Sequence, residues 1–387
     1  MPVTPENESR GGNAALVARV REAIDAAGGS ISFAEYMDLA LFAPGLGYYS
    51  ASSHQFGAGG DFVTAPESSP LFARCVARQA VEILAALGGG DVCEVGAGSG
   101  ALAADLLECF AGAECGPRRY RIVERSPSLR ERQRAHIAAR AVDGAPPVEW
   151  CDQVPHAMRG VVLANEVLDA IPAQRFRIHG DSVRELRVGW RDGAFHWVDA
   201  DCAGSALARH VDAIRGSLAH ALEDGYASEC APARQAWVQR LGESLAAGVA
   251  LVFDYGYGRA EYYHPQRTRG TLRCFHRHRA HDDPLVLIGL QDISVHVDFT
   301  ALAEAAVDAG LEVAGYTSQA AFLLATGLLD ACRDVDPASR RHAELTAQIK
   351  RLTLPGEMGE AIKVLALARD FDGPLAGFAG RDLRGRL

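Results

Sequence analysis

Residues 92–100 read Val92-Cys93-Glu94-Val95-Gly96-Ala97-Gly98-Ser99-Gly100. The first four residues are mostly apolar, which suits a buried strand of a parallel sheet. The three glycines that follow allow a tight turn, and the apolar residues after position 100 begin a helix. Strand, glycine turn and helix in this order are typical of the ligand-binding edge of a doubly wound sheet. We therefore expect an α/β fold in which a small ligand that carries an adenosine lies against this turn.

The glycine turn by itself does not identify the ligand, because Gly96, Gly98 and Ala101 also fit the dinucleotide-binding pattern G-x-G-x-x-G/A. Glu94 favours S-adenosylmethionine, because a carboxylate at this position would repel a pyrophosphate but attract an ammonium group. An NAD-binding turn and a glycine-rich turn without a ligand are the alternatives. The residues of this stretch that we expect to bind the cofactor are Glu94, Gly96, Ala97, Gly98 and Gly100.

The composition is that of a globular protein with room for a core domain of about 200 residues and additions. A formal net charge of −10 argues against nucleic-acid binding, and no apolar run approaches the roughly 20 residues of a membrane span. The nine cysteines contain no C-x-x-C pair, and the histidines lack a metal-binding spacing, so we expect no metal site. Reduced thiols and the lack of an apolar N-terminal segment predict a cytoplasmic protein.

Strands and helices alternate after the glycine turn, as a doubly wound parallel sheet requires. Serine and proline at positions 126 and 127 are typical of a helix start. We expect the last two strands of the sheet to be its only hairpin-like pair. After the strand at 92–95, the predicted strands are 120–124, 148–150, 161–166, 248–254, 311–316 and 362–368.

Two long additions interrupt this alternation. Roughly 80 residues separate the fourth and fifth strands, and 174–198 alternates polar with apolar residues like a small antiparallel meander. Residues 256–297 are rich in His, Arg and Tyr and show little periodicity. The predicted division is 1–12 as a disordered lead-in, 13–88 as helices and a glycine-rich loop, 89–173 as the cofactor-binding core, 174–247 as the insertion, 248–370 as the completed core with the 256–297 extension, and 371–387 as a tail.

Polar side chains end several of the predicted strands, where ligands of open α/β sheets bind. Glu124 ends the second strand and can accept hydrogen bonds from ribose hydroxyls, and Asp152 can reach an adenine amino group. Asn165 and Glu166 end the fourth strand, and Asp254 ends the fifth. Because the carboxyl ends of parallel strands meet at one edge of the sheet, we expect these side chains to converge on the cofactor and its substrate.

The ordered series of motifs resembles the MidA family of class I S-adenosylmethionine-dependent methyltransferases, formerly a family of uncharacterised domains. The resemblance covers nearly the whole chain. The segments that carry it are Ser32-Phe33 to Tyr48-Tyr49, the loop 60–67, the stretch 94–100, Ala164 to Pro172, Asp254 to Tyr257, Gly270 to Leu272, Gly289 to Ile293, His296 to Phe299 and Pro355 to Glu360.

The resemblance implies a seven-stranded Rossmann-like sheet with an N-terminal helical extension and a substrate-binding insertion. It also implies protein arginine methylation, because a mitochondrial member dimethylates an arginine on a quinone-module subunit of respiratory complex I. The lack of a targeting peptide fits a bacterial cytoplasmic member with a protein substrate. A non-catalytic S-adenosylmethionine-binding assembly factor is the main alternative, and an NAD-dependent oxidoreductase is less favoured.

An arginine acceptor would need carboxylates, because its guanidinium is positively charged and repels a sulfonium. We expect Glu166 to be the main guanidinium clamp, with Asn165 orienting the cofactor or the substrate and Asp254 beside them. Asp61 and Glu67 of the glycine-rich loop are expected helpers, and Thr64 and Pro66 of the same loop are expected to contact the cofactor. The additions 174–247 and 256–297 would form the peptide groove.

Overall fold

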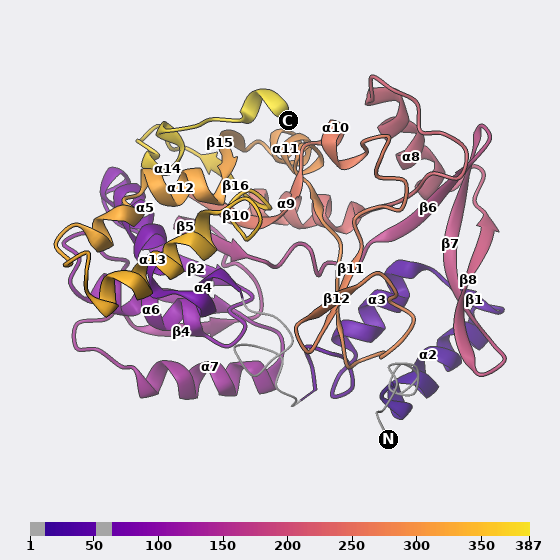
Figure 1. Ribbon diagram of the computed structural model, residues 1–387, viewed down its shortest axis with the longest axis horizontal. Helices are drawn as coiled ribbons and strands as arrows, with labels where there is room; N and C mark the ends of the chain where they lie inside the picture. The colour runs from indigo at the N-terminus through magenta and orange to yellow at the C-terminus, as the bar shows by residue number, and fades with distance from the viewer. Residues whose placement is uncertain (1–11, 52–63) are drawn as a thin grey trace. The chain divides into compact units, whose positions relative to one another are not determined.

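The computed structural model describes residues 12–51 and 64–387 (Figure 1). These residues form two compact units. The sheet unit consists of residues 64–168, Gln235–Gly256 and Phe299–Leu387. The insertion unit consists of residues 12–51, Asp169–Arg234 and Tyr257–Asp298. Each unit is therefore built from segments that are distant in the sequence.

The sheet unit is an α/β fold whose hydrogen-bonded strands follow the order β15-β16-β10-β5-β2-β3-β4. Its first five strands along the chain pair in parallel, as predicted. We expected only one antiparallel pair, but β16 lies between β10 and β15 and runs antiparallel to both. The strands are β2 (Asp91–Val95), β3 (Tyr120–Val123), β4 (Val148–Cys151), β5 (Met158–Asn165), β10 (Leu245–Tyr257), β15 (Glu312–Ser318) and β16 (Ile362–Arg369).

Helices of this unit connect the strands and cover the sheet (Figure 1). We assigned no elements between the last two strands, and the structure places α12, the 3₁₀ helix η1 and α13 there. The helices are α4 (Ala65–Ser68), α5 (Pro70–Leu87), α6 (Ala101–Ala111), α7 (Pro127–Ala139), α11 (Phe299–Asp308), α12 (Gln319–Ala325), η1 (Leu328–Cys332), α13 (Arg340–Thr353), α14 (Ala376–Ala379) and η2 (Arg384–Arg386), while α9 (Pro232–Ser244) leads into β10.

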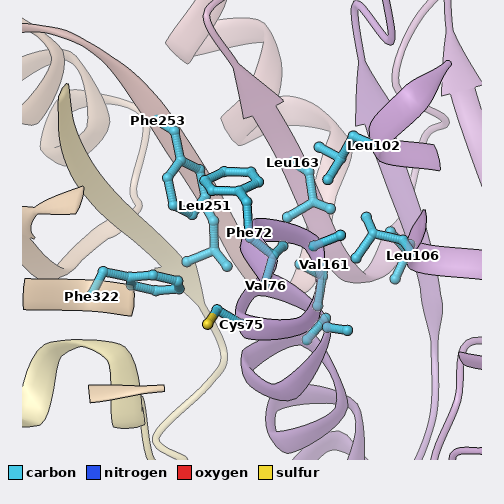
Figure 2. Packing of buried hydrophobic residues seen from close by; sticks show 14 of the residues in the cluster. Phe72, Cys75, Val76, Leu102, Leu106, Val161, Leu163, Leu251, Phe253 and Phe322 are labelled. Atoms are coloured by element: carbon cyan, nitrogen blue, oxygen red, sulfur yellow. The ribbon is translucent and has the colours of Figure 1, made fainter. Parts of the chain in front are cut away.

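Helix α5 is the centre of the main hydrophobic core (Figure 2). Its ends are well defined, because Ser69 accepts a hydrogen bond from the N–H of Leu71 and Gly88 adopts a left-handed conformation after the last turn. Phe72 packs edge to face against Phe253 of β10, with ring centres 5.3 Å apart. Burial of this many apolar side chains is the main favourable term in folding, and it holds α5 on the central strands that carry the site.

The insertion unit contains the predicted meander, formed by β6 (Gln174–His179), β7 (Ser182–Arg191) and β8 (Ala194–Asp201). Two further strands that we did not predict join it: β1 (Ser30–Ile31) pairs with β7, and β9 (Ala227–Cys230) pairs with β6. The N-terminal segment therefore belongs to the same sheet as the insertion. The helices of this unit are α2 (Ala14–Ala26), α3 (Phe33–Phe42), α8 (Ala206–Ser217) and α10 (Arg259–Tyr262).

The 256–297 extension contains a second small sheet of β11 (Arg273–His276), β12 (Arg279–His281) and β13 (Asp292–Ser294), followed by the short strand β14 (Val297–Asp298). Strands of three or four residues are too short to produce a recognisable alternation, which explains why the sequence indicated little structure here. Throughout 12–51 and 64–387, no helix has the length and apolar character that crossing a membrane requires.

Candidate cofactor and acceptor site

The glycine turn connects β2 to α6 with a backbone that only glycine adopts easily. Gly96, Gly98 and Gly100 have φ angles of 68°, 53° and 84°, all in the left-handed region. Gly100 is also the N-cap residue of α6, and it provides no side chain to cap the first N–H groups. These donors and the bare backbone of the turn suit close contact with a ligand.

Helix α4 is attached to this turn by a side-chain hydrogen bond. The hydroxyl of Ser99 donates to Oε1 of Glu67 at 2.9 Å. Thr64 is the N-cap residue of α4 and makes no side-chain capping bond, while Pro66 is buried in the first turn of the helix. The segment that contains the predicted residues Thr64 and Pro66 is thus held beside the glycine turn. Asp61 lies outside the described residues.

Glu124 follows β3, and its largely buried carboxylate is held on both oxygens. Oε1 accepts the backbone N–H of Ser126 at 2.9 Å, and Oε2 accepts Nε2–H of Gln133 at 3.1 Å. Burial raises the pKa of Glu124, while these hydrogen bonds lower it. A carboxylate can accept about four hydrogen bonds, so Glu124 retains capacity for a further donor. This capacity suits a ribose hydroxyl.

Glu94 lies inside the sheet unit with only 3% of its surface exposed. Its Oε2 accepts the hydroxyl hydrogen of Tyr120 at 2.6 Å. The pKa of Glu94 is raised to about 7, mainly by burial; the hydrogen bond from Tyr120 lowers the pKa in part, and the nearby charge of Glu124 adds to the rise. A cation at this position would therefore favour a carboxylate whose ionisation is otherwise costly.

Asp152 occupies a different environment, immediately after β4. Its side chain is 88% exposed and pairs with Nη2 of Arg130 at 2.5 Å. The same guanidinium donates to the carbonyl oxygens of Glu124 and Cys151. Asp152 is therefore positioned by Arg130 near the end of β3, and its contact with an adenine stays a prediction.

Asn165 and Glu166 end β5 in an unusual local conformation. Glu166 has a φ of 51°, which is uncommon for a residue with a side chain and is typical of functional positions. Its Oε1 accepts hydrogen bonds from Nδ2 of Asn165 at 3.2 Å and from the backbone N–H of Ala65 at 3.4 Å. Oδ1 of Asn165 is buried and accepts no hydrogen bond from any residue within the described ranges. A buried carbonyl oxygen of this kind is suited to a donor on a ligand.

Asp254 lies in β10 beside this turn, and its side chain is fully buried. Oδ2 accepts the backbone N–H groups of Val167 at 3.2 Å and Leu168 at 2.8 Å, while Oδ1 accepts that of Tyr255 at 2.9 Å. The carboxylate thus binds the backbone directly after Glu166. This arrangement indicates that Asp254 positions the turn.

Gln133 of α7 is the residue of this site that sequence reasoning missed. It contacts both the glycine turn and Glu124, because its Nε2 donates to the carbonyl of Gly98 at 3.0 Å as well as to the carboxylate. The one available signal was a polar residue four positions after Leu129, on the face that α7 buries.

These residues fit S-adenosylmethionine. The bare glycine turn can approach an adenosine closely, Glu124 retains acceptor capacity for ribose hydroxyls, and the unpaired Oδ1 of Asn165 can accept an N–H. The sheet has parallel strands and one antiparallel strand, β16. This strand order, with the polar residues at the ends of the parallel strands, is that of a Rossmann-like methyltransferase of the class I type.

The family follows from a match over residues 75–317 to the model of a family of S-adenosyl-L-methionine-dependent methyltransferases. The chain belongs to this family, and S-adenosylmethionine is its cofactor. The MidA-type resemblance and the predicted fold class are thus confirmed.

Individual relatives agree with this assignment. A Danio rerio protein named mitochondrial protein arginine methyltransferase NDUFAF7 is 30% identical over 377 residues, which cover 88% of this chain and 83% of that protein. The Homo sapiens protein of the same name is 28% identical, with 88% and 80% covered. A crystal structure of a Burkholderia thailandensis protein bound to S-adenosylhomocysteine is 42% identical, with a TM-score of 0.91 over 100% of both chains.

Proposed function

We propose that this enzyme transfers a methyl group from S-adenosylmethionine to an arginine side chain of a protein. The observation that carries the proposal is the carboxylate of Glu166, held at the end of β5 by Asn165 and the N–H of Ala65. A fixed carboxylate suits a guanidinium, which presents planar N–H donors. The names of the relatives, as protein arginine methyltransferases, support the same acceptor.

The bound cofactor supplies an electrophilic methyl group on its sulfonium. In the reaction, the bond from sulfur to methyl breaks and leaves neutral S-adenosylhomocysteine, a bond from a guanidinium nitrogen to methyl forms, and the proton that this nitrogen loses passes to water. Glu166 holds the guanidinium in one orientation and offsets its positive charge beside the sulfonium. Glu67, attached to the glycine turn through Ser99, adds a second carboxylate on the same side of the sheet unit.

Asn165 and Asp254 support this clamp in different ways. Asn165 donates to Glu166 and keeps Oδ1 for a donor on the cofactor or the substrate. Asp254 acts as a positioning residue, because its carboxylate binds the N–H groups of Val167 and Leu168. The proposed cofactor contacts are Glu94, Gly96, Ala97, Gly98, Gly100, Glu124, Asp152, Asn165, Thr64 and Pro66.

The proposed partner is a protein subunit of a complex I-type respiratory enzyme, as the MidA-type resemblance implies. The nine free cysteines support a reducing compartment, and we propose the bacterial cytoplasm. A methyltransferase transfers a labelled methyl group from the cofactor to protein, whereas a non-catalytic assembly factor does not. This transfer can be measured and separates the two proposals.

The test is transfer of a tritiated methyl group to protein in a lysate from cells that lack this gene. The wild-type enzyme is expected to label arginine, identified after acid hydrolysis. Glu166→Gln is nearly isosteric, so it should lower transfer by about 10²–10⁴-fold while cofactor affinity stays within a few-fold. Glu114→Gln, on the exposed turn after α6, is the matched control and should keep full activity. Label on lysine, or full activity of Glu166→Gln, would contradict the arginine proposal.

A further inference from the structure

Helix α7 carries one polar side chain that is completely buried. Gln133 has 0% of its surface exposed, although most of the helix is polar and faces water. Burial of an uncharged amide is unfavourable unless its donors and acceptor are all paired. The partners of this amide therefore indicate why a glutamine occupies the position.

Among the described residues, the Gln133 amide makes three polar contacts, each to a different part of the sheet edge. Nε2 donates to the carbonyl of Gly98 at 3.0 Å and to Oε2 of Glu124 at 3.1 Å. Oε1 accepts the indole N–H of Trp150 in β4 at 3.0 Å. The opposite amide orientation would place Oε1 against two acceptors and the NH₂ group against a donor, so these partners select a single orientation.

The indole that selects this orientation is itself held in place. The guanidinium of Arg134 lies 4.8 Å from the centre of the Trp150 ring, a cation–π geometry. Gln133 also fits closely against the glycine turn, because a Cβ atom at Gly100 would lie 3.3 Å from Cα of Gln133. The contacts thus run from Trp150 through Gln133 to both Glu124 and the glycine turn.

We infer that Gln133 is a positioning residue for cofactor binding, which presents the Glu124 carboxylate to the ribose. The inference rests on the proposed contact between Glu124 and the ribose hydroxyls. With Oε2 held by Gln133 and Oε1 by the Ser126 N–H, the carboxylate cannot rotate without losing a charge-assisted hydrogen bond. Its free acceptor positions therefore stay in one direction before the cofactor arrives, which lowers the cost of ordering on binding.

The test uses Gln133→Met, which keeps the approximate volume and removes every hydrogen bond of the amide. Isothermal calorimetry is expected to show about tenfold weaker binding of S-adenosylhomocysteine. Binding of its 2′,3′-dideoxy analogue should change by less than twofold, because that ligand has no hydroxyls for Glu124. Gln239→Met on the exposed face of α9 is the matched control and should bind both ligands like the wild type. An equal loss for both ligands, or no loss, would overturn the inference.

A double-mutant cycle with Glu124→Gln separates this inference from the proposed ribose contact. Gln133→Met should have little further effect once Glu124 is replaced. If Glu124→Gln alone leaves S-adenosylhomocysteine binding unchanged, the ribose contact itself is wrong. If Glu124→Gln weakens binding but Gln133→Met does not, only the role of Gln133 is wrong.

Trp150→Phe is a second variant that tests the same inference. It can be used even if Gln133→Met does not fold. It removes the indole N–H that selects the amide orientation and keeps an aromatic ring for Arg134. We expect about threefold weaker binding of S-adenosylhomocysteine and unchanged binding of the dideoxy analogue. Unchanged binding of both ligands to a folded Trp150→Phe would overturn the inference.

Discussion

Tyr120 donates its hydroxyl hydrogen to the carboxylate of Glu94 across 2.6 Å, and both side chains are buried in adjacent parallel strands. The carboxylate that accepts this bond lies two residues before the glycine turn. Burial nevertheless outweighs the bond and raises the pKa of Glu94 to about 7. A carboxylate beside a cationic cofactor is thus costly to ionise before that cofactor binds.

Replacement of Glu94 by glutamine should therefore stabilise the ligand-free protein at neutral and higher pH. The usual pKa of 4.5 rises to about 7 on folding, so the folded state binds more protons between these values. The stability of the wild type consequently falls as the pH rises from 4.5 to 7, by an amount on the order of 3 kcal/mol from this group. Urea unfolding should show Glu94→Gln more stable than the wild type at pH 8, with the difference vanishing near pH 4. Glu131→Gln, at an exposed position of α7, is the control and should match the wild type at both pH values. A difference between Glu94→Gln and the wild type that does not change with pH would contradict this account.

The left-handed glycine turn predicts a loss of cofactor binding in Gly98→Val. A β-branched residue is strongly disfavoured at the φ of 53° found there, so it would distort the turn that we propose as the cofactor contact. Calorimetry should detect no binding of S-adenosylhomocysteine, while far-UV circular dichroism stays close to that of the wild type. Gly112→Val is the control, because Gly112 has a φ of −105° and a Cβ atom there would meet nothing within 4 Å. Wild-type affinity in folded Gly98→Val would exclude the turn from the site.

The bonds of Asp254 to the backbone predict an effect on the Glu166 turn. Asp254→Asn replaces one accepting oxygen by an NH₂ group that faces an N–H donor, and a hydrogen bond to a charged group contributes about 1.5–3 kcal/mol. We expect a loss of stability of about this size in urea unfolding, and a larger relative loss of methyl transfer than of cofactor affinity. Asp372→Asn, at an exposed position, should match the wild type. A variant with unchanged stability would show that these bonds contribute nothing to the turn.

Local patterns in the sequence were sufficient for the main elements of the sheet unit. The apolar run before Gly96 predicted β2, and Ser126 with Pro127 predicted the start of α7, because capping and strand burial depend on neighbouring residues. The polar ends of β3 and β5 followed from the same patterns. The family resemblance then supplied the cofactor and the expectation of a seven-stranded sheet, while the order of the strands came from the structure.

Only the tertiary structure decided which partner each polar group has. The pairing of Ser30 with Gly189, the bonds of Asp254 to the turn after Glu166, and the contacts of Gln133 all join residues that are distant in the sequence or on separate elements. The sequence predicted only that Asp254 belongs to the acceptor site beside Glu166, whereas its burial and three backbone donors support the positioning role that we propose for it. A sequence specifies which groups can donate or accept a hydrogen bond, but the packing of the elements determines which of them meet and which remain available to a ligand.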